Sequence, residues 1–268
     1  MNENDDPGRA ALDEALIAIA EGRCDEALAL LEEMDPARPE RWTTSAHARI
    51  ELGQFAEAEE ALAHAREILG PDDEEVLWTE GRLRLHQWKL DEARAAFARL
   101  DVAREGVPLV ENLALLMELA GDFPRADQLF LLAFQADPRG SPLPPRLSPE
   151  RFEKLVAEAA RELPEQFQGA LEETAVVIDP MPTAEIVGAP GSGHPPDILG
   201  LFVGTPLGER GAEQTPELPP TIFLFQRNLE RAARTQDELR EEIRTTLYHE
   251  LGHALGFDEE GVDELGLG

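Results

Sequence analysis

The stretch GQFAEAEEAL, residues 53–62, decides the fold of the first half of the chain, because versions of it recur at a nearly constant distance. Aligned on a shared alanine, the other copies are GRCDEALALL at 22–31, WKLDEARAAF at 88–97 and GDFPRADQLF at 121–130. Successive alanines are 31, 35 and 33 residues apart, at Ala27, Ala58, Ala93 and Ala126. A fixed period of this length is typical of stacked structural repeats.

Each copy also carries an apolar residue three positions before the alanine and a large apolar residue four positions after it. The first set is Cys24, Phe55, Leu90 and Phe123, and the second is Leu31, Leu62, Phe97 and Phe130. Residues with these spacings lie on one face of a helix. The turn before the helix contains a glycine in three copies, at 22, 53 and 121, and Trp88 in the fourth. The pattern predicts helix–turn–helix units in which the small alanine lets a neighbouring helix approach closely.

These segments resemble the tetratricopeptide repeat, a helix–turn–helix unit of about 34 residues. The resemblance covers about residues 8–137 and includes Trp42, which lies where that family often has a tryptophan in the first helix. It implies a short right-handed solenoid of about four helix pairs with a concave face. It also implies that the repeats bind a protein or peptide partner.

The segment PRGSPLPPRL at 138–147 contains four prolines and predicts an extended linker at a domain boundary. Beyond it, a helix is expected from Ser148-Pro149 and another from near Thr235. Three short apolar runs between them are typical of strands: Thr174–Ile178, Ile198–Val203 and Thr221–Phe225. The sequence therefore predicts an α+β protein, with an all-α repeat domain at 8–137 and a small α/β domain at 148–268.

The strongest chemical signal is YHELGHALGFDEE, residues 248–260. His249 and His253 are one helical turn apart, so both imidazoles present themselves to one point, as a tetrahedral metal ion requires. Glu250 leans over the same face and can accept a proton from a metal-bound water. Gly256 follows where the helix must end, and the turn there swings the next acids back toward the histidines.

One of these acids is expected to be the third metal ligand. In zinc peptidases with the extended pattern HExxHxxGxxH, the last ligand is six residues after the second histidine, and Glu259 occupies that position. A shift of one residue in the turn would bring in Asp258 instead. One Zn²⁺ bound in this way keeps its fourth position for water or a substrate carbonyl, as in catalytic zinc sites.

The C-terminal half also resembles the bacterial minimal zincins, small metallopeptidases with the signature HExxHxxGxx(D/E). The resemblance spans about residues 148–268. It rests on RFEKLVAEAARELPEQF, TAVVID, DILGLFVGTPLGER, PPTIFLFQRNLER and TLYHELGHALGFDEEGVDELGL, which follow one another in the same order. It implies a compact α/β zincin core, a metal held at His249, His253 and Glu259, and a peptide substrate.

Zinc peptidases usually add a residue that stabilises the oxyanion. The single tyrosine, Tyr248, is adjacent to a ligand on the helix and should point about 100° away from the metal. His194, in a glycine- and proline-rich loop, and Arg227, after the third strand, are the candidates. A solvated loop histidine and a surface arginine are the alternative interpretation of these two residues.

Composition narrows the choice of partner and compartment. The chain has 24 basic and 55 acidic residues, a net charge of −31, which argues against nucleic acid and membrane as partners. A single cysteine, Cys24, excludes an internal disulfide and fits a reducing compartment. The first ten residues, MNENDDPGRA, lack the pattern of a secretory signal. We therefore expect a cytoplasmic protein.

Two functions remain open at this stage. The first is a zinc-dependent metallopeptidase, a hydrolase, with Glu250 as general base and with repeats that recruit a protein partner or substrate. The alternative is an interaction scaffold of helical repeats whose zincin domain is stabilised by metal and weakly active or inactive. A purely structural metal would need a closed fourth position, and no further cysteine or histidine lies nearby in the sequence.

Overall fold

The computed structural model describes residues 7–189, 193–207, 219–258 and 261–262. The chain forms two compact units. The repeat unit comprises Met1–Leu116 and Gly188–Pro196, and the C-terminal unit comprises Met117–Val187 and Asp197–Gly268. A short segment that follows the first strand in the chain therefore belongs to the repeat unit.

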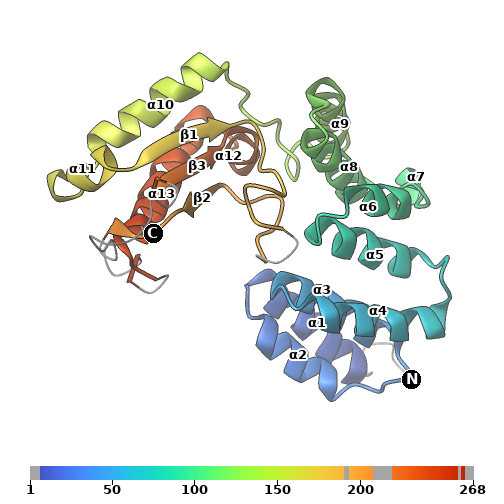
Figure 1. The fold of residues 1–268 in the computed structure, drawn as a ribbon. Coiled ribbons are helices and arrows are strands. Elements are labelled where there is room, and N and C mark those ends of the chain that lie inside the picture. The colour runs from blue at the N-terminus through green and yellow to red at the C-terminus, as the bar shows by residue number, and fades with distance from the viewer. Residues whose placement is uncertain (1–6, 190–192, 208–218, 259–260, 263–268) are drawn as a thin grey trace. The chain divides into compact units, whose positions relative to one another are not determined.

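The repeat unit consists of helices packed in successive pairs (Figure 1). Its helices are α1 (Pro7–Ala20), α2 (Cys24–Glu32), α3 (Pro39–Glu51), α4 (Phe55–Leu69), α5 (Glu74–His86), α6 (Leu90–Phe97), the short α7 (Val102–Glu105) and most of α8 (Val107–Leu119). Helix α1 contacts α2, α3 contacts α4, and α5 contacts α6. The first helices of the pairs, α1, α3 and α5, also contact one another in succession, so they form one face of the unit.

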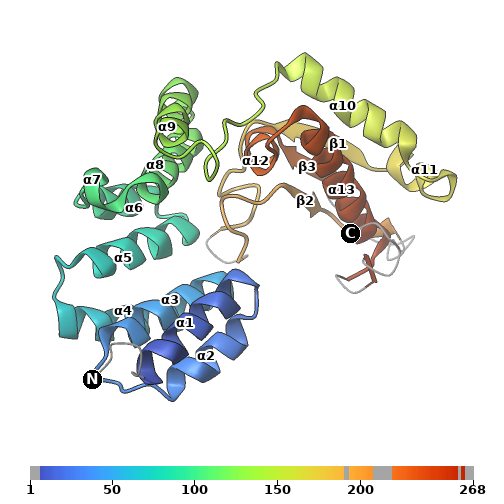
Figure 2. The ribbon, with the colours of Figure 1, turned by 180° about the vertical axis from the view of Figure 1, so that it is seen from behind.

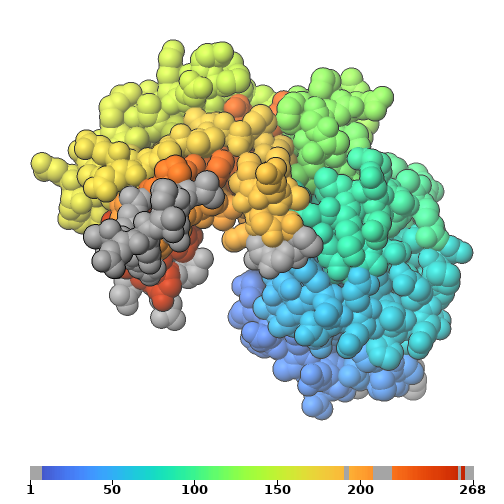
Figure 3. Space-filling model, in the orientation of Figure 1, coloured from blue at the N-terminus to red at the C-terminus, as the bar shows by residue number. Residues whose placement is uncertain are grey.

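The predicted small–large pattern forms the interior of the helix pairs. All four shared alanines are completely buried. The large residues four positions later, Leu31, Leu62, Phe97 and Phe130, are buried as well. Burial of each large side chain contributes about 1.5–3 kcal/mol, so the recurring pattern stabilises every pair. In the space-filling view, the helices of this unit form a continuous surface on the side shown (Figure 3).

The turn before each second helix requires a left-handed backbone. The glycines at this turn have φ of +76°, +68° and +76° at Gly22, Gly53 and Gly121. Trp88, which replaces the glycine before α6, has φ of +60°, a conformation that costs a non-glycine residue about 1–2 kcal/mol. Its indole Nε1 donates a hydrogen bond to the main-chain oxygen of His194 at 3.0 Å. Trp88 thereby holds the segment Gly188–Pro196 on the repeat unit.

The C-terminal unit contains helices and one small sheet. Its elements are α9 (Phe123–Ala136), α10 (Pro149–Glu162), α11 (Glu165–Glu172), β1 (Ala175–Asp179), β2 (Gly200–Val203), β3 (Thr221–Phe225), α12 (Gln226–Ala232) and α13 (Gln236–Leu255). The strand order is β1-β3-β2, with β1 parallel and β2 antiparallel to β3. All three predicted strands are present, whereas α11 and α12 were not expected from the sequence.

Helix α13 lies along one face of this sheet (Figures 1 and 2). It contacts β2, β3 and α10. The shared core contains Phe152 and Val156 from α10, Ile222 and Leu224 from β3, and Leu239, Ile243, Leu247 and Leu251 from α13. An all-helical N-terminal region followed by a small three-stranded sheet confirms the predicted α+β class. Among the described residues, no helix has the combination of length and apolar character that a bilayer span demands.

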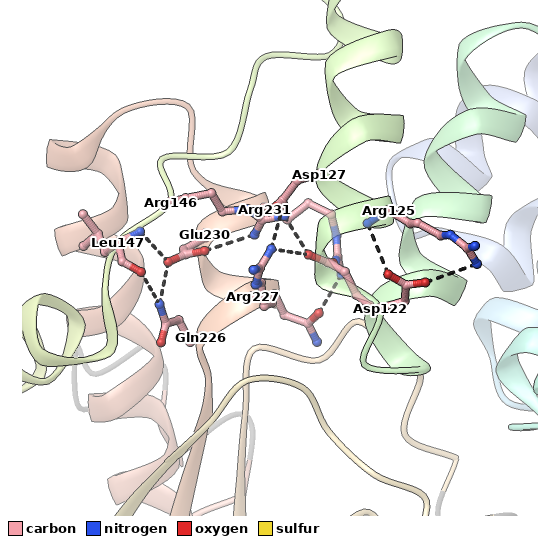
Figure 4. A network of polar contacts seen from close by, with 11 residues as sticks. Asp122, Arg125, Asp127, Arg146, Leu147, Gln226, Arg227, Glu230 and Arg231 are labelled. Atoms are coloured by element: carbon pink, nitrogen blue, oxygen red, sulfur yellow. Dashed lines mark hydrogen bonds and ion pairs between the residues drawn. The ribbon is translucent and has the colours of Figure 1, made fainter.

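Residues 138–147 form neither helix nor strand, as the prolines predict, but they are packed into the C-terminal unit. Arg146 pairs with Glu118 at 2.6 Å and with Glu230 at 3.0 Å. The main chain of Leu147 donates to Glu230 and accepts from Gln226 (Figure 4). Helix α9 and the connector thus share a compact unit with the sheet. The domain limits 8–137, 138–147 and 148–268 stay a prediction, and the compact units divide at Leu116 instead.

Candidate metal centre

Helix α13 is fixed at its first turn by a reciprocal cap. The Thr235 hydroxyl accepts a hydrogen bond from the Glu238 amide at 3.1 Å, and the Glu238 carboxylate accepts one from the Arg234 amide at 2.7 Å. The buried leucine and isoleucine stripe of α13 then determines which face of the helix meets the core. His249 and His253 lie on the other side and are partly exposed.

The two histidines converge as the sequence predicts. Their Nε2 atoms are 3.1 Å apart, and their rings are nearly perpendicular, at 85°. Nδ1 of His253 lies 3.0 Å from the main-chain oxygen of Phe257. Because a carbonyl oxygen only accepts hydrogen bonds, Nδ1 carries the proton there and Nε2 keeps its lone pair. Metal-binding histidines are commonly oriented by a hydrogen bond of this kind.

This donor pair fits a zinc ion. Zinc binds imidazole nitrogen at about 2.0–2.1 Å with tetrahedral angles, which places two such nitrogens about 3.3 Å apart. The separation of 3.1 Å between the Nε2 atoms is close to that value. The described residues contain no cluster of three or more histidine, cysteine or acidic side chains suited to a metal. The predicted third ligand, Glu259, lies outside the described residues.

Glu250 lies beside the pair and is held by the edge strand β2. Its side chain is buried, and Oε2 accepts a hydrogen bond from the main-chain amide of Phe202 at 2.7 Å. The approach of β2 depends on Gly200, because a Cβ added there would lie 2.7 Å from Thr246 Cγ2 and 3.0 Å from Glu250 Cγ. Sequence reasoning missed this contact, although a glycine within the apolar run DILGLFV was a usable signal.

The chain turns back after α13, as predicted. Gly256 adopts the left-handed conformation, with φ of 95°, and the Phe257 amide donates to the Gly252 carbonyl at 3.1 Å. Val262 then packs directly on the helix, since a Cβ added to Gly252 would lie 2.6 Å from Val262 Cγ2. Gly252 therefore allows Val262 to join the hydrophobic core of the unit after the turn.

Asp258, the alternative third ligand, is exposed and has a structural partner. Its Oδ1 accepts a hydrogen bond from the Gly261 amide at 3.0 Å, and its main-chain oxygen accepts one from the Val262 amide at 2.9 Å. The Asp258 carboxylate thus stabilises the returning turn.

Tyr248, which the sequence excludes from oxyanion stabilisation, and the candidate Arg227 both make other contacts. Tyr248 is buried, and its hydroxyl donates to the Ala159 carbonyl at 3.0 Å, so it points into the core as predicted. Arg227 pairs with Asp127 at 2.7 Å (Figure 4). It also lies over the Phe123 ring, at 4.5 Å from the ring centroid. The other candidate, His194, belongs to the repeat unit. Sequence reasoning did not foresee the polar network that Arg227 joins.

Comparison with known families agrees with the expected repeats and with the expected zincin domain. Residues 171–268 match the model of a family described as zincin-like metallopeptidase. Residues 18–77 match the tetratricopeptide repeat. No curated protein matches the chain. The chain therefore combines tetratricopeptide repeats with a zincin-like metallopeptidase domain.

Proposed function

We propose that this chain is a zinc-dependent metallopeptidase whose single Zn²⁺ is held by His249, His253 and Glu259. The observation that carries the proposal is the 3.1 Å separation of the two Nε2 atoms on the helical face that also bears Glu250. Zinc supplies Lewis-acid polarisation of a substrate carbonyl and of water when it is bound. The helical repeats recruit a protein partner or substrate. The single cysteine, Cys24, is buried and has no disulfide, which fits a cytoplasmic location.

Glu250 is assigned the role of general base. The hydrogen bond from the Phe202 amide fixes the orientation of its carboxylate. A carboxylate held in this way accepts the proton of the attacking water and later passes it to the leaving amine. His253 is held in one tautomer by the Phe257 carbonyl, so the protein fixes both the base and one ligand before substrate arrives.

Replacing Glu250 by glutamine tests this role. The variant keeps the size of the side chain and both histidines, so we expect an unchanged zinc content and a loss of turnover of about 10²–10⁴-fold. Zinc is measured by atomic absorption and turnover by cleavage of casein. Glu241→Gln, the same change nine residues earlier and therefore on the opposite face of α13 from Glu250, is the matched control and should keep full activity. Unchanged casein cleavage by Glu250→Gln would refute the mechanism.

We propose Glu259 rather than Asp258 as the third ligand, because the Asp258 carboxylate already accepts the Gly261 amide. Glu259→Gln should weaken zinc binding by at least about tenfold in a titration with a competing chelator. Asp258→Asn keeps an oxygen acceptor for Gly261 and should leave the affinity nearly unchanged. The reverse pattern would assign the ligand to Asp258.

The alternative function is an interaction scaffold with a metal-stabilised zincin domain that is weakly active or inactive. A cavity on the repeat unit favours it, since binding there needs no catalysis. Wild-type protein that contains zinc but cleaves neither casein nor other peptide substrates would establish the scaffold and end the peptidase proposal.

A further inference from the structure

The first helices of the repeat unit surround a cavity of about 420 Å³. Its walls come from α1, α3, α5 and the region of α7 and α8, and they include Leu16, Glu40, Thr44, Glu75, Trp78 and Glu105. A volume between about 300 and 1,000 Å³ is typical of sites that bind a small molecule or a side chain. All of these residues lie within one compact unit, so the cavity belongs to the repeats alone.

The cavity carries negative charge that no lining cation offsets. Glu40, Glu74, Glu75 and Glu105 line it, and none of the other described residues lining it is a lysine or an arginine. Glu74 pairs with Arg104, but the Glu75 carboxylate contacts only the neutral Thr43 hydroxyl, at 3.4 Å, among the described residues. Burial, and then repulsion from Glu40 and Asp73, raises the pKa of Glu75. A cation from outside would relieve this repulsion.

The one basic group among the lining residues does not compensate for these acids. Burial, followed by repulsion from Arg82 and His86, lowers the pKa of His47 to about 4. His47 is therefore neutral near pH 7, and its Nε2 lies 3.4 Å from the Thr79 hydroxyl. At neutral pH the cavity presents carboxylates and neutral polar groups.

The interior of the cavity offers an unused polar group and an apolar surface. Thr44 is 5% exposed and lines the cavity, and its hydroxyl has no hydrogen-bond partner within the described part of the chain. Leu16 is 46% exposed and adds an apolar surface to the same cavity. Trp78 supplies an aromatic ring that can contact an aliphatic stem or a cation. The site therefore suits a long side chain with an apolar stem and a positively charged end.

We propose that this cavity binds an arginine side chain of a partner polypeptide. Glu40 and Glu75 hold the guanidinium, Thr44 accepts one of its N–H groups, and Trp78 and Leu16 contact the stem and an apolar neighbour. Arginine is favoured over lysine because its planar fork of donors can engage two carboxylates at once. The net charge of −31 attracts a basic partner over longer distances. The proposal rests on the recruiting role that the proposed function gives the repeats, and it does not depend on turnover.

The test measures binding of a short fluorescein-labelled peptide of alternating arginine and leucine to the full-length chain by fluorescence anisotropy. Its analogues replace arginine by citrulline, which has the same shape without the charge, or by glutamate. All three tryptophans, Trp42, Trp78 and Trp88, belong to the repeat unit, so tryptophan fluorescence reports independently whether this unit is occupied. We expect the arginine peptide to bind at least about tenfold more tightly than the citrulline peptide, since a charged hydrogen bond contributes about 1.5–3 kcal/mol.

Glutamine substitutions locate the site. The double variant Glu40→Gln/Glu75→Gln should weaken binding of the arginine peptide at least about tenfold. The control Glu60→Gln/Glu67→Gln, which removes two charges from exposed positions on α4 outside the cavity, should change it little. Equal effects of the control and of Glu40→Gln/Glu75→Gln would show that net charge alone attracts the peptide and would overturn the proposal. Stronger binding of the citrulline or glutamate peptide would also overturn it.

Two further arms separate related explanations. Spermidine should compete only weakly with the labelled arginine peptide. If it competed as strongly as the unlabelled peptide, the ligand of the cavity would be a small polyamine and the proposal of a polypeptide partner would be overturned. The measurement is repeated on Glu250→Gln, where the proposal requires unchanged peptide binding. Wild-type protein that binds the arginine peptide but does not cleave casein would refute only the peptidase proposal, whereas wild-type protein that cleaves casein but does not bind the peptide would refute only this inference.

Discussion

The two units treat acidic side chains in opposite ways. In the C-terminal unit, the completely buried Glu118 side chain contacts three arginines, Arg146, Arg227 and Arg231. Asp127 and Glu230 complete this network, so three acids face three bases (Figure 4). In the repeat unit, Glu40 and Glu75 border a cavity that no described lysine or arginine lines.

This difference separates a structural charge from one that is available to a ligand. The network around Glu118 joins α8 and α9 to the connector and α12, because each arginine reaches an acid on another element. A buried ion pair that loses one partner leaves a buried charge uncompensated, which is strongly destabilising. The acids at the cavity instead repel one another in the isolated protein. Substitution of an acid in the network should therefore destabilise the C-terminal unit. Substitution of an acid at the cavity should leave the fold of the repeat unit intact.

The largest effect is expected for Glu118→Gln. Burial lowers the pKa of the Arg231 guanidinium, and the charge of Glu118 offsets this, so neutralising Glu118 removes the compensation. We expect a loss of about 3–5 kcal/mol in the stability of the C-terminal unit. Urea unfolding followed by circular dichroism measures this loss, while tryptophan fluorescence follows the repeat unit.

The matched control is Glu153→Gln, which removes an exposed acid from α10 in the same unit. It should change stability by no more than about 0.5 kcal/mol. If the network did not contribute to stability, both variants would show the same small change in the free energy of unfolding. That result would contradict the contrast between the two units.

A smaller effect is expected from acidification of the repeat unit. The pKa of His47 falls from 6.5 to about 4 on folding, so folding favours the neutral ring. The neutral His47 ring makes its full contribution to the stability of the repeat unit above pH 6.5. As the pH falls toward 4, the free energy of unfolding decreases by about 2–3 kcal/mol. Urea midpoints from tryptophan fluorescence, compared between the wild type and His47→Gln, should converge over this range. Parallel curves for the two proteins would show that His47 titrates normally.

The smallest effect is expected for Glu75→Gln, and it is a gain in stability, whereas the effects above are losses. The pKa of Glu75 is raised in the folded chain, so its ionised form opposes folding above its ordinary pKa of 4.5. Because Glu75 is only partly buried and keeps contact with solvent, the variant should gain no more than about 0.5 kcal/mol at pH 7 and should gain nothing well below pH 4.5. Thermal unfolding followed by tryptophan fluorescence measures this gain. A clear loss of stability would mean that Glu75 has a structural role like that of Glu118.

The sequence by itself determined what depends on neighbours along the chain. The period of the alanines predicted the helix pairs, because the residues that pack together are a few positions apart on one helical face. The histidine pair and the turn at Gly256 were predicted for the same reason, since helix geometry alone brings residues 249 and 253 together. The apolar runs likewise predicted where the strands lie.

Only the tertiary structure decided what depends on contacts between distant segments. The strand order, the approach of β2 to Glu250 and the meeting of Glu118 with three arginines join residues about 30 to 113 positions apart. No local rule specifies such partners, because many acids and arginines in this chain have equivalent local surroundings. The same limit applies to the cavity, whose charge becomes visible only when α3, α5 and α7 bring their acids to one side.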